Sequence, residues 1–138
     1  MNSGAKKHIM KQLGKSKLMI PHKFIYIDDE TQLETPEISG HVIVVEFLFT
    51  SAECSLLETD YSARIYFEIP DEYPFEPPNI TLNDPIDHPL VDWNIVRLND
   101  YCVVITFPNL VMNVYYIILE ALNNGKNDGL LNFINNKK

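Results

Sequence analysis

The chain has 138 residues and holds only two cysteines, one tryptophan and no long hydrophobic run. Cys54 and Cys102 are too few for a disulfide framework and lack zinc-ligand spacing, so we expect no structural disulfide, metal or cofactor. No stretch of 18 apolar residues occurs, which argues against a membrane span. The first residues, MNSGAKKHIMKQLGKSK, lack the apolar segment of a secretory signal. These absences favour a reducing, intracellular setting, and we expect the cytoplasm, with the nucleus as a further location.

Positive charge is scarce in most of the chain and concentrated at its start. Residues 1–23 contain six lysines and no acid, whereas residues 24–138 contain five basic residues against all nineteen acids. An acidic body of this kind repels phosphates, which argues against nucleic acid as a partner. The lysines, with Lys6, Lys7 and Lys11 among them, predict either a solvated helix face or a contact for an acidic partner or an anionic membrane surface.

The first half of the chain predicts a helix followed by four strands. Apolar residues in AKKHIMKQLGKSKLM recur at helical spacing, although Gly14 weakens this helix. The next segments are rich in β-branched and aromatic residues and alternate with period two. Their links have hairpin length, so we expect an antiparallel meander. The predicted ranges are 5–19 for the helix, with Ile9, Leu13 and Leu18 on its apolar side, and 22–28, 40–50, 60–70 and 80–82 for the strands.

The second half predicts an irregular stretch and then helices. From Asn83 to Phe107 the pattern breaks, and irregular segments of this length in a compact domain are usually functional. A helix then begins with Asn109 as N-cap and stops at Asn124-Gly125. GLLNFIN predicts a short last helix. We therefore expect one α+β domain over residues 1–138, with its core at about 5–135.

A proline-rich loop connects the third and fourth predicted strands. IPDEYPFEPPN, residues 69–79, contains four prolines, each of which fixes its own φ and restricts the residue before it. The loop is therefore stiff, with Tyr73, Pro74, Pro77 and Pro78 as its structural residues. The Pro77–Pro78 bond is the predicted cis peptide, because bonds before proline lose most of their trans preference.

In this context the sequence resembles the ubiquitin-conjugating fold. A strand ends in Ile-Pro, EYPFEPP follows, His88-Pro89 comes at the proper distance, and a long helix begins after Phe-Pro-Asn-Leu. The resemblance covers about residues 5–135. It implies a helix, a four-stranded antiparallel meander, an irregular stretch at the active site and a central helix, which is the order that the periodicity predicts. The fold alone does not decide whether the chain is an enzyme.

The resemblance also implies that the active site is degenerate. In active members an asparagine follows the His-Pro pair and stabilises the oxyanion, and the nucleophilic cysteine comes about ten residues after the histidine. Here Leu90 stands at the asparagine, and Arg97 or Leu98 stands at the cysteine, depending on a one-residue shift. Neither residue can form a thioester, and His88 is implied to hold the loop through backbone hydrogen bonds. The degenerate positions are His88, Pro89, Leu90, Arg97 and Leu98.

Cys102 is the alternative nucleophile. It lies four or five residues beyond the expected place, the neighbouring Asp100 disfavours a thiolate, and the following Val-Val-Ile predicts burial. We therefore interpret Cys102, and Cys54 in its hairpin loop, as structural thiols. A divergent conjugating enzyme that uses Cys102 stays open as an alternative.

These observations favour a non-catalytic variant that binds ubiquitin, a ubiquitin-like protein or an active conjugating enzyme. In active relatives the first helix meets the activating enzyme, so Lys6, Lys7 and Lys11 are candidates for a partner surface. HPLVD, residues 88–92, resembles the non-catalytic branch of the fused-toes (Akt-interacting) proteins, which implies a scaffold subunit of a trafficking complex instead. The sequence also leaves little room for the family's pair of C-terminal helices.

Overall fold

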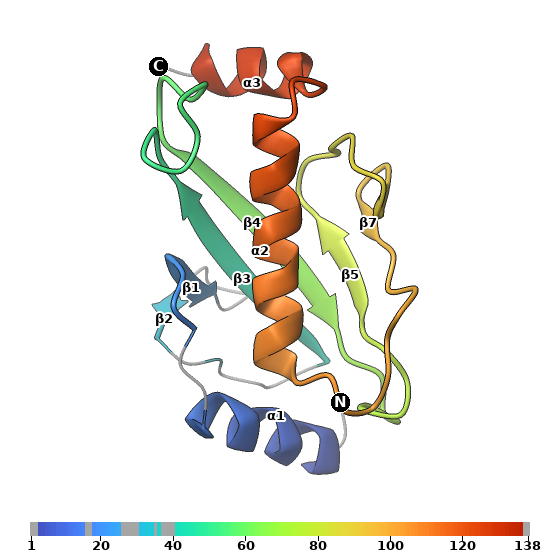
Figure 1. Cartoon of the computed structure of the whole chain (residues 1–138). Coiled ribbons are helices and arrows are strands. Elements are labelled where there is room, and N and C mark those ends of the chain that lie inside the picture. Colours follow the sequence, from blue (N-terminus) through green and yellow to red (C-terminus); the bar gives the residue numbers. More distant parts are fainter. Residues whose placement is uncertain (1–2, 16–17, 26–30, 35, 37–40, 137–138) are drawn as a thin grey trace.

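A computed structural model describes residues 3–15, 18–25, 31–34, 36 and 41–136. The strands of this part of the chain form one antiparallel sheet in the order β2-β1-β3-β4-β5-β7-β6. Helix α2 lies across one face of the sheet, and α1 and α3 lie near its two ends (Figure 1). The predicted α+β class is confirmed. The elements are α1 Ser3–Lys15, β1 His22–Ile25, β2 Gln32–Leu33, β3 Val42–Phe49, β4 Tyr61–Glu68, β5 Asn79–Leu82, β6 Val91–Asp92, β7 Ile95–Val96, α2 Phe107–Asn123 and α3 Asp128–Asn135.

The four predicted strands are β1, β3, β4 and β5, and each pairs with the next in chain order. In β4 the alternation places Ala63, Ile65 and Phe67 in the core, with less buried residues between them. The prediction missed β2, β6 and β7, because a two-residue strand is too short to show a period of two. The predicted continuation of the first strand through residues 26–28 lies outside the described residues.

Aromatic side chains join α2 to the sheet. The Tyr115 ring of α2 stacks on Phe49 of β3, with ring centroids 5.0 Å apart, and meets Phe47 edge-on at 5.4 Å. Phe107, at the start of α2, contacts Phe67 of β4 at 5.3 Å. Ring pairs at these distances add to the free energy of burying large apolar side chains. The same face of α2 buries Leu110, Val111, Val114, Ile118, Ala121 and Leu122.

Helix α2 begins three residues earlier than the sequence predicts. Thr106, not Asn109, is its N-cap: the Thr106 hydroxyl oxygen accepts the Asn109 N–H at 3.3 Å. Pro108 fits in the first turn because the N–H groups there have no partner within the helix. One of them, the Phe107 N–H, donates to Gln12 Oε1 of α1 at 2.7 Å. The prediction took Phe107-Pro108 as the end of a loop and so missed the cap.

Helix α1 confirms the predicted amphipathic pattern with shifted ends. Ala5 and Ile9 are buried, and Lys6, Lys7 and Lys11 are exposed. The predicted helix runs to residue 19, whereas α1 ends at Lys15 and residues 16–17 lie outside the described residues. Leu18 packs against the core from beyond the helix.

The predicted cis bond is wrong. Among the described residues the cis peptide is Tyr73–Pro74, not Pro77–Pro78. Every bond before a proline in this loop loses most of its trans preference, so that argument does not select one bond among them. The surroundings differ, since the Tyr73 side chain is buried in the core.

Two glycines near the end of α2 provide a matched test of backbone strain. Gly125 follows the Asn124 C-cap with φ +77°, whereas Gly129 lies inside α3, and an added Cβ would meet no atom within 4 Å at either position. We expect Gly125→Ala to lower the free energy of unfolding by about 1 kcal/mol, because a side chain is strained at positive φ. Gly129→Ala should raise it by about 0.5–1 kcal/mol. Urea unfolding of both variants checks this, and a shift in the same direction would contradict it.

Candidate functional site

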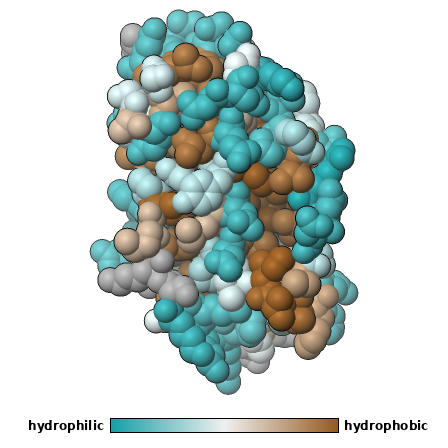
Figure 2. All heavy atoms as spheres, viewed as in Figure 1, coloured by the Kyte–Doolittle hydropathy of each residue, from teal (hydrophilic) through white to brown (hydrophobic). Residues whose placement is uncertain are grey.

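Residues 97–105 run beside α2 and leave an open groove of about 320 Å³. Figure 2 shows hydrophobic atoms in a recess beside α2, with hydrophilic atoms along its rim. We call this recess the loop–α2 groove. Its lining includes Leu90, Arg97, Leu98 and Tyr101 from the loop side and Asn113, Tyr116 and Glu120 from α2.

The structure brings three of the degenerate positions together in this groove. Leu90, Arg97 and Leu98 all line it. His88 lies buried beneath the loop, and Pro89 is exposed in the turn between His88 and Leu90. Arg97 also donates its backbone N–H to the Leu90 carbonyl at 2.8 Å, so the two positions are held side by side.

Cys102 is exposed, which contradicts the predicted burial. The Val-Val-Ile run suggests a core segment, but residues 102–105 form a turn in which the Ile105 N–H donates to the Cys102 carbonyl at 3.0 Å. Ile105 packs against the core, whereas Val104 is 77% exposed. Tyr101 and Ile105 line the groove, whereas Cys102 does not. Cys54 is buried as expected, with its thiol 3.6 Å from the Leu122 carbonyl oxygen.

His88 ties the loop to α2 through both ring nitrogens. Nδ1 accepts the Leu90 N–H at 3.0 Å, and Nε2 lies 2.9 Å from Glu120 Oε2. The tautomer protonated on Nε2 satisfies both hydrogen bonds. The bond to the Leu90 backbone is of the kind that the resemblance implies. No local pattern predicts the contact with Glu120, which is 32 residues away in the chain. With both nitrogens engaged, the imidazole is a support for the loop.

Asn127 is a second support that the sequence analysis missed. Its Oδ1 accepts the Asp87 N–H at 2.8 Å, and its Nδ2 donates to the carbonyls of Asp87 at 3.2 Å and Ala121 at 2.9 Å. The side-chain amide thus pairs with both backbone groups of Asp87, as a neighbouring strand would. Asn127 is only 6% exposed, so its polar atoms depend on these partners. The residue before His88 is therefore fixed to the segment that follows α2.

The β6–β7 hairpin projects next to the groove with an unusual residue at its tip. The pairs Val91–Val96 and Asp92–Ile95 leave a two-residue loop of Trp93 and Asn94. Trp93 has φ +61° at the first loop position, which glycine or asparagine usually fills in such hairpins. A bulky side chain there costs about 1–2 kcal/mol. The Trp93 side chain is nevertheless 73% exposed.

Hydrogen bonds fix the backbone of this tip. The Ile86 N–H donates to the Trp93 carbonyl at 3.2 Å, and the Leu82 N–H donates to the Asn94 carbonyl at 2.7 Å. The Asn94 side chain returns a hydrogen bond to the Leu82 carbonyl at 3.3 Å. The tip is therefore tied to β5 and to the loop that follows it. Neither the turn nor a role for Trp93 was predicted from the sequence. The available signal was Asn94, a turn residue that follows a short alternation of apolar and polar residues.

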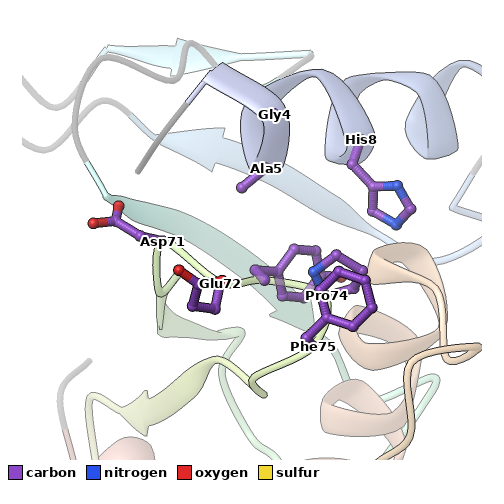
Figure 3. A pocket seen from close by; sticks show the side chains of 8 residues that line it. Gly4, Ala5, His8, Asp71, Glu72, Pro74 and Phe75 are labelled. Atoms are coloured by element: carbon purple, nitrogen blue, oxygen red, sulfur yellow. The ribbon is translucent and has the colours of Figure 1, made fainter.

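A second concave surface lies between α1 and the proline loop. It has a volume of about 310 Å³, and Figure 3 shows Ala5 and His8 of α1 facing Glu72, Pro74 and Phe75 across it. Phe75 is 79% exposed. We call this hollow, together with the exposed lysines of α1, the α1–proline-loop surface.

Tyr101 connects the two surfaces. It lines the loop–α2 groove, and its hydroxyl donates a hydrogen bond to the Pro74 carbonyl of the proline loop. Burial, followed by the charge of the neighbouring Cys102, raises the pKa of Tyr101 above its usual value. The phenol is therefore protonated at neutral pH and remains a donor to Pro74. The loops of both surfaces share this contact.

Within the described part of the chain, no cluster of histidine, cysteine, aspartate or glutamate is placed to hold a metal ion. No helix there has the length and apolar character needed to cross a membrane.

The order of elements and the groove beside α2 define an α+β protein with a ubiquitin-conjugating-like fold. The model of the RWD domain family matches residues 22–124, and the chain belongs to this family. RWD domains are protein-interaction modules that share the ubiquitin-conjugating-like fold. A comparison with curated proteins gave no match.

Asn127 allows a test of how the loop before His88 is supported. We expect Asn127→Leu to lower the free energy of unfolding by about 1–3 kcal/mol, because the Asp87 N–H loses its partner and the carbonyls of Asp87 and Ala121 each lose a donor. Asn124→Ala is the matched control: Asn124 is exposed and donates to the same Asp87 carbonyl at 3.3 Å, so its loss should cost about 1 kcal/mol or less. Chemical denaturation measures both, and equal costs would show that Asn127 is no special support.

Proposed function

We propose that the protein is a non-catalytic binding module of the ubiquitin or ubiquitin-like pathway. One observation carries the proposal: the groove holds Leu90, Arg97 and Leu98 where the ubiquitin-conjugating resemblance has its asparagine and cysteine. Thioester formation needs a thiolate at the reacting position, and the later transfer needs a donor for the oxyanion. An arginine or a leucine supplies neither a thiolate nor a thioester bond. Membership of the RWD family supports a role in protein binding.

The α1–proline-loop surface is the contact that we assign to the partner. Phe75 stands on a stiff loop and is 79% exposed, and exposed aromatic side chains on rigid backbone carry much of the energy of protein interfaces. Lys6, Lys7 and Lys11 are exposed on the neighbouring helix and give it a positive field against an acidic body. The surface thus suits an acidic face on a partner such as an active ubiquitin-conjugating enzyme.

The exposure of Cys102 makes the enzymatic alternative directly testable. We expect no thioester when the protein is mixed with activating enzyme, ATP and ubiquitin, or with a ubiquitin-like protein and its own activating enzyme. Cys102 does not line the groove in which Leu90, Arg97 and Leu98 stand. A non-reducing gel is the measurement. An adduct that disappears with reductant and in Cys102→Ala would overturn the proposal and establish a divergent enzyme.

The partner contact is expected to weaken with salt. Binding is measured by calorimetry against a panel of ubiquitin, ubiquitin-like proteins and active conjugating enzymes. For the panel member that binds, we expect affinity to fall steadily from about 0.05 M to about 0.3 M salt, because exposed charge pairs are screened over about 10 Å. The triple variant Lys6→Gln, Lys7→Gln and Lys11→Gln should remove that dependence, because it removes the positive charges.

Two single variants complete this test. Phe75→Ala should cost about 1–2 kcal/mol of binding free energy. Lys126→Glu changes an exposed lysine between α2 and α3 and should leave affinity unchanged. If affinity is the same at every salt concentration and in the triple variant, the lysines of α1 only keep the protein soluble.

A further inference from the structure

We propose that the outer face of the β6–β7 hairpin and the adjoining loop–α2 groove dock a partner segment in which a hydrophobic residue is flanked by lysine or arginine; this rests on the proposed function as a binding module. We call the exposed residues Leu90, Trp93 and Ile95 the hairpin patch.

Trp93 is the first reason for this assignment. Glycine would adopt the positive φ of this position without strain, yet the position holds the only tryptophan of the chain. Its side chain is 73% exposed, so packing within the protein does not explain it. The Ile86 N–H donates to the Trp93 carbonyl, and Leu82 holds the backbone of the next residue, Asn94, which means that little backbone entropy is lost when Trp93 binds. A rigid, solvent-exposed tryptophan is typical of an interface anchor.

The register of the hairpin extends this anchor into a patch. Val91 and Val96 face each other on the side toward the protein, and Val96 is 5% exposed. The opposite side carries Ile95, which is 54% exposed although it is strongly apolar. Leu90 lies where the hairpin meets the groove and lines that groove together with Arg97. The tip, the outer face and the groove are therefore continuous.

The charges around the patch determine the chemistry of the ligand. Among the described residues of the hairpin and the groove lining, the cation is Arg97, which lies 3.7 Å from Asp92, and both are exposed. Asp100 and Glu120 remain on the groove wall, and the body of residues 24–138 carries nineteen acids against five basic residues. A ligand with lysine or arginine next to its apolar residue is complementary to this field. Such cations also interact favourably with the face of an exposed tryptophan.

The same charges argue against a second copy of this chain as the occupant. A two-fold contact through the hairpin patch would bring equivalent acidic groups of the two copies together. Like charges that face each other across an interface are unfavourable. Phosphate-bearing ligands are disfavoured for the same reason.

Trp93 provides the measurement, since its fluorescence reports on the hairpin patch alone. The full chain is titrated with the synthetic peptide GSKRLFKRSG, with GSDELFDESG as the control of opposite charge and with GSKRSGKRSG as the control without apolar residues. We expect GSKRLFKRSG to shift the emission of Trp93 to shorter wavelength and to protect it from acrylamide quenching. Both controls should bind at least about tenfold more weakly.

Substitutions then locate the binding. Ile95→Ser and Asp100→Asn should each lower the affinity for GSKRLFKRSG about threefold to tenfold. Phe75→Ala, an equally exposed aromatic residue on the other surface, should have no effect. Trp93→Gly, followed by amide NMR shifts, should lose binding while its thermal midpoint stays equal or rises, because glycine relieves the positive φ.

Three results would each overturn this inference: unchanged Trp93 emission up to about 1 mM peptide, an equal response to GSKRSGKRSG, or a blue shift caused by protein concentration alone. If the chain binds its panel partner while the peptide leaves Trp93 unaffected, the hairpin patch is excluded and the proposed function stands. If Cys102 forms a thioester, the proposed function fails whatever the peptide does.

Discussion

The contact between α2 and the sheet is the constraint on which the rest of the structure depends. Burying an aromatic side chain such as Phe47 or Phe49 contributes about 1.5–3 kcal/mol, whereas an exposed ion pair such as Asp92–Arg97 contributes about 1 kcal/mol or less. The packing of rings therefore decides where α2 lies. Once α2 is placed, it supplies one wall of the groove, Glu120 for His88 and the Ala121 carbonyl for Asn127.

The parts of the fold that repeat with a regular period could be predicted from the sequence. The central strands and α2 follow from periods of two and 3.6, and the proline loop and His88-Pro89 indicated the ubiquitin-conjugating fold. The resemblance also selected Leu90, Arg97 and Leu98, which line one groove. Contacts between distant residues could not be predicted, because no local pattern encodes that Asn127 pairs with Asp87. The exposure of Cys102 was missed because an apolar run does not distinguish a turn from a buried strand.

The two candidate surfaces differ in how they present an aromatic residue. Phe75 stands at the mouth of a hollow between a helix and a loop, whereas Trp93 stands at the tip of a hairpin tied to β5. The hydroxyl of Tyr101 links the proline loop of the first surface to the groove beside the hairpin. A change at Tyr101 would disturb the two surfaces together. Substitutions of exposed residues, which make few internal contacts, are therefore the ones that test each surface independently of the other.

The supports of the site lie partly beyond the segment that defines the family. The match covers residues 22–124. However, Gln12, which lies in α1, accepts a hydrogen bond from the first N–H of α2, and Asn127, which lies after α2, accepts one from the Asp87 N–H. A fragment cut at the family limits would leave the N–H groups of Phe107 and Asp87 without these partners. It would also expose the parts of the core against which Ile9 and Leu131 pack. The smallest piece of this protein that keeps the groove intact is thus larger than the domain by which it is recognised.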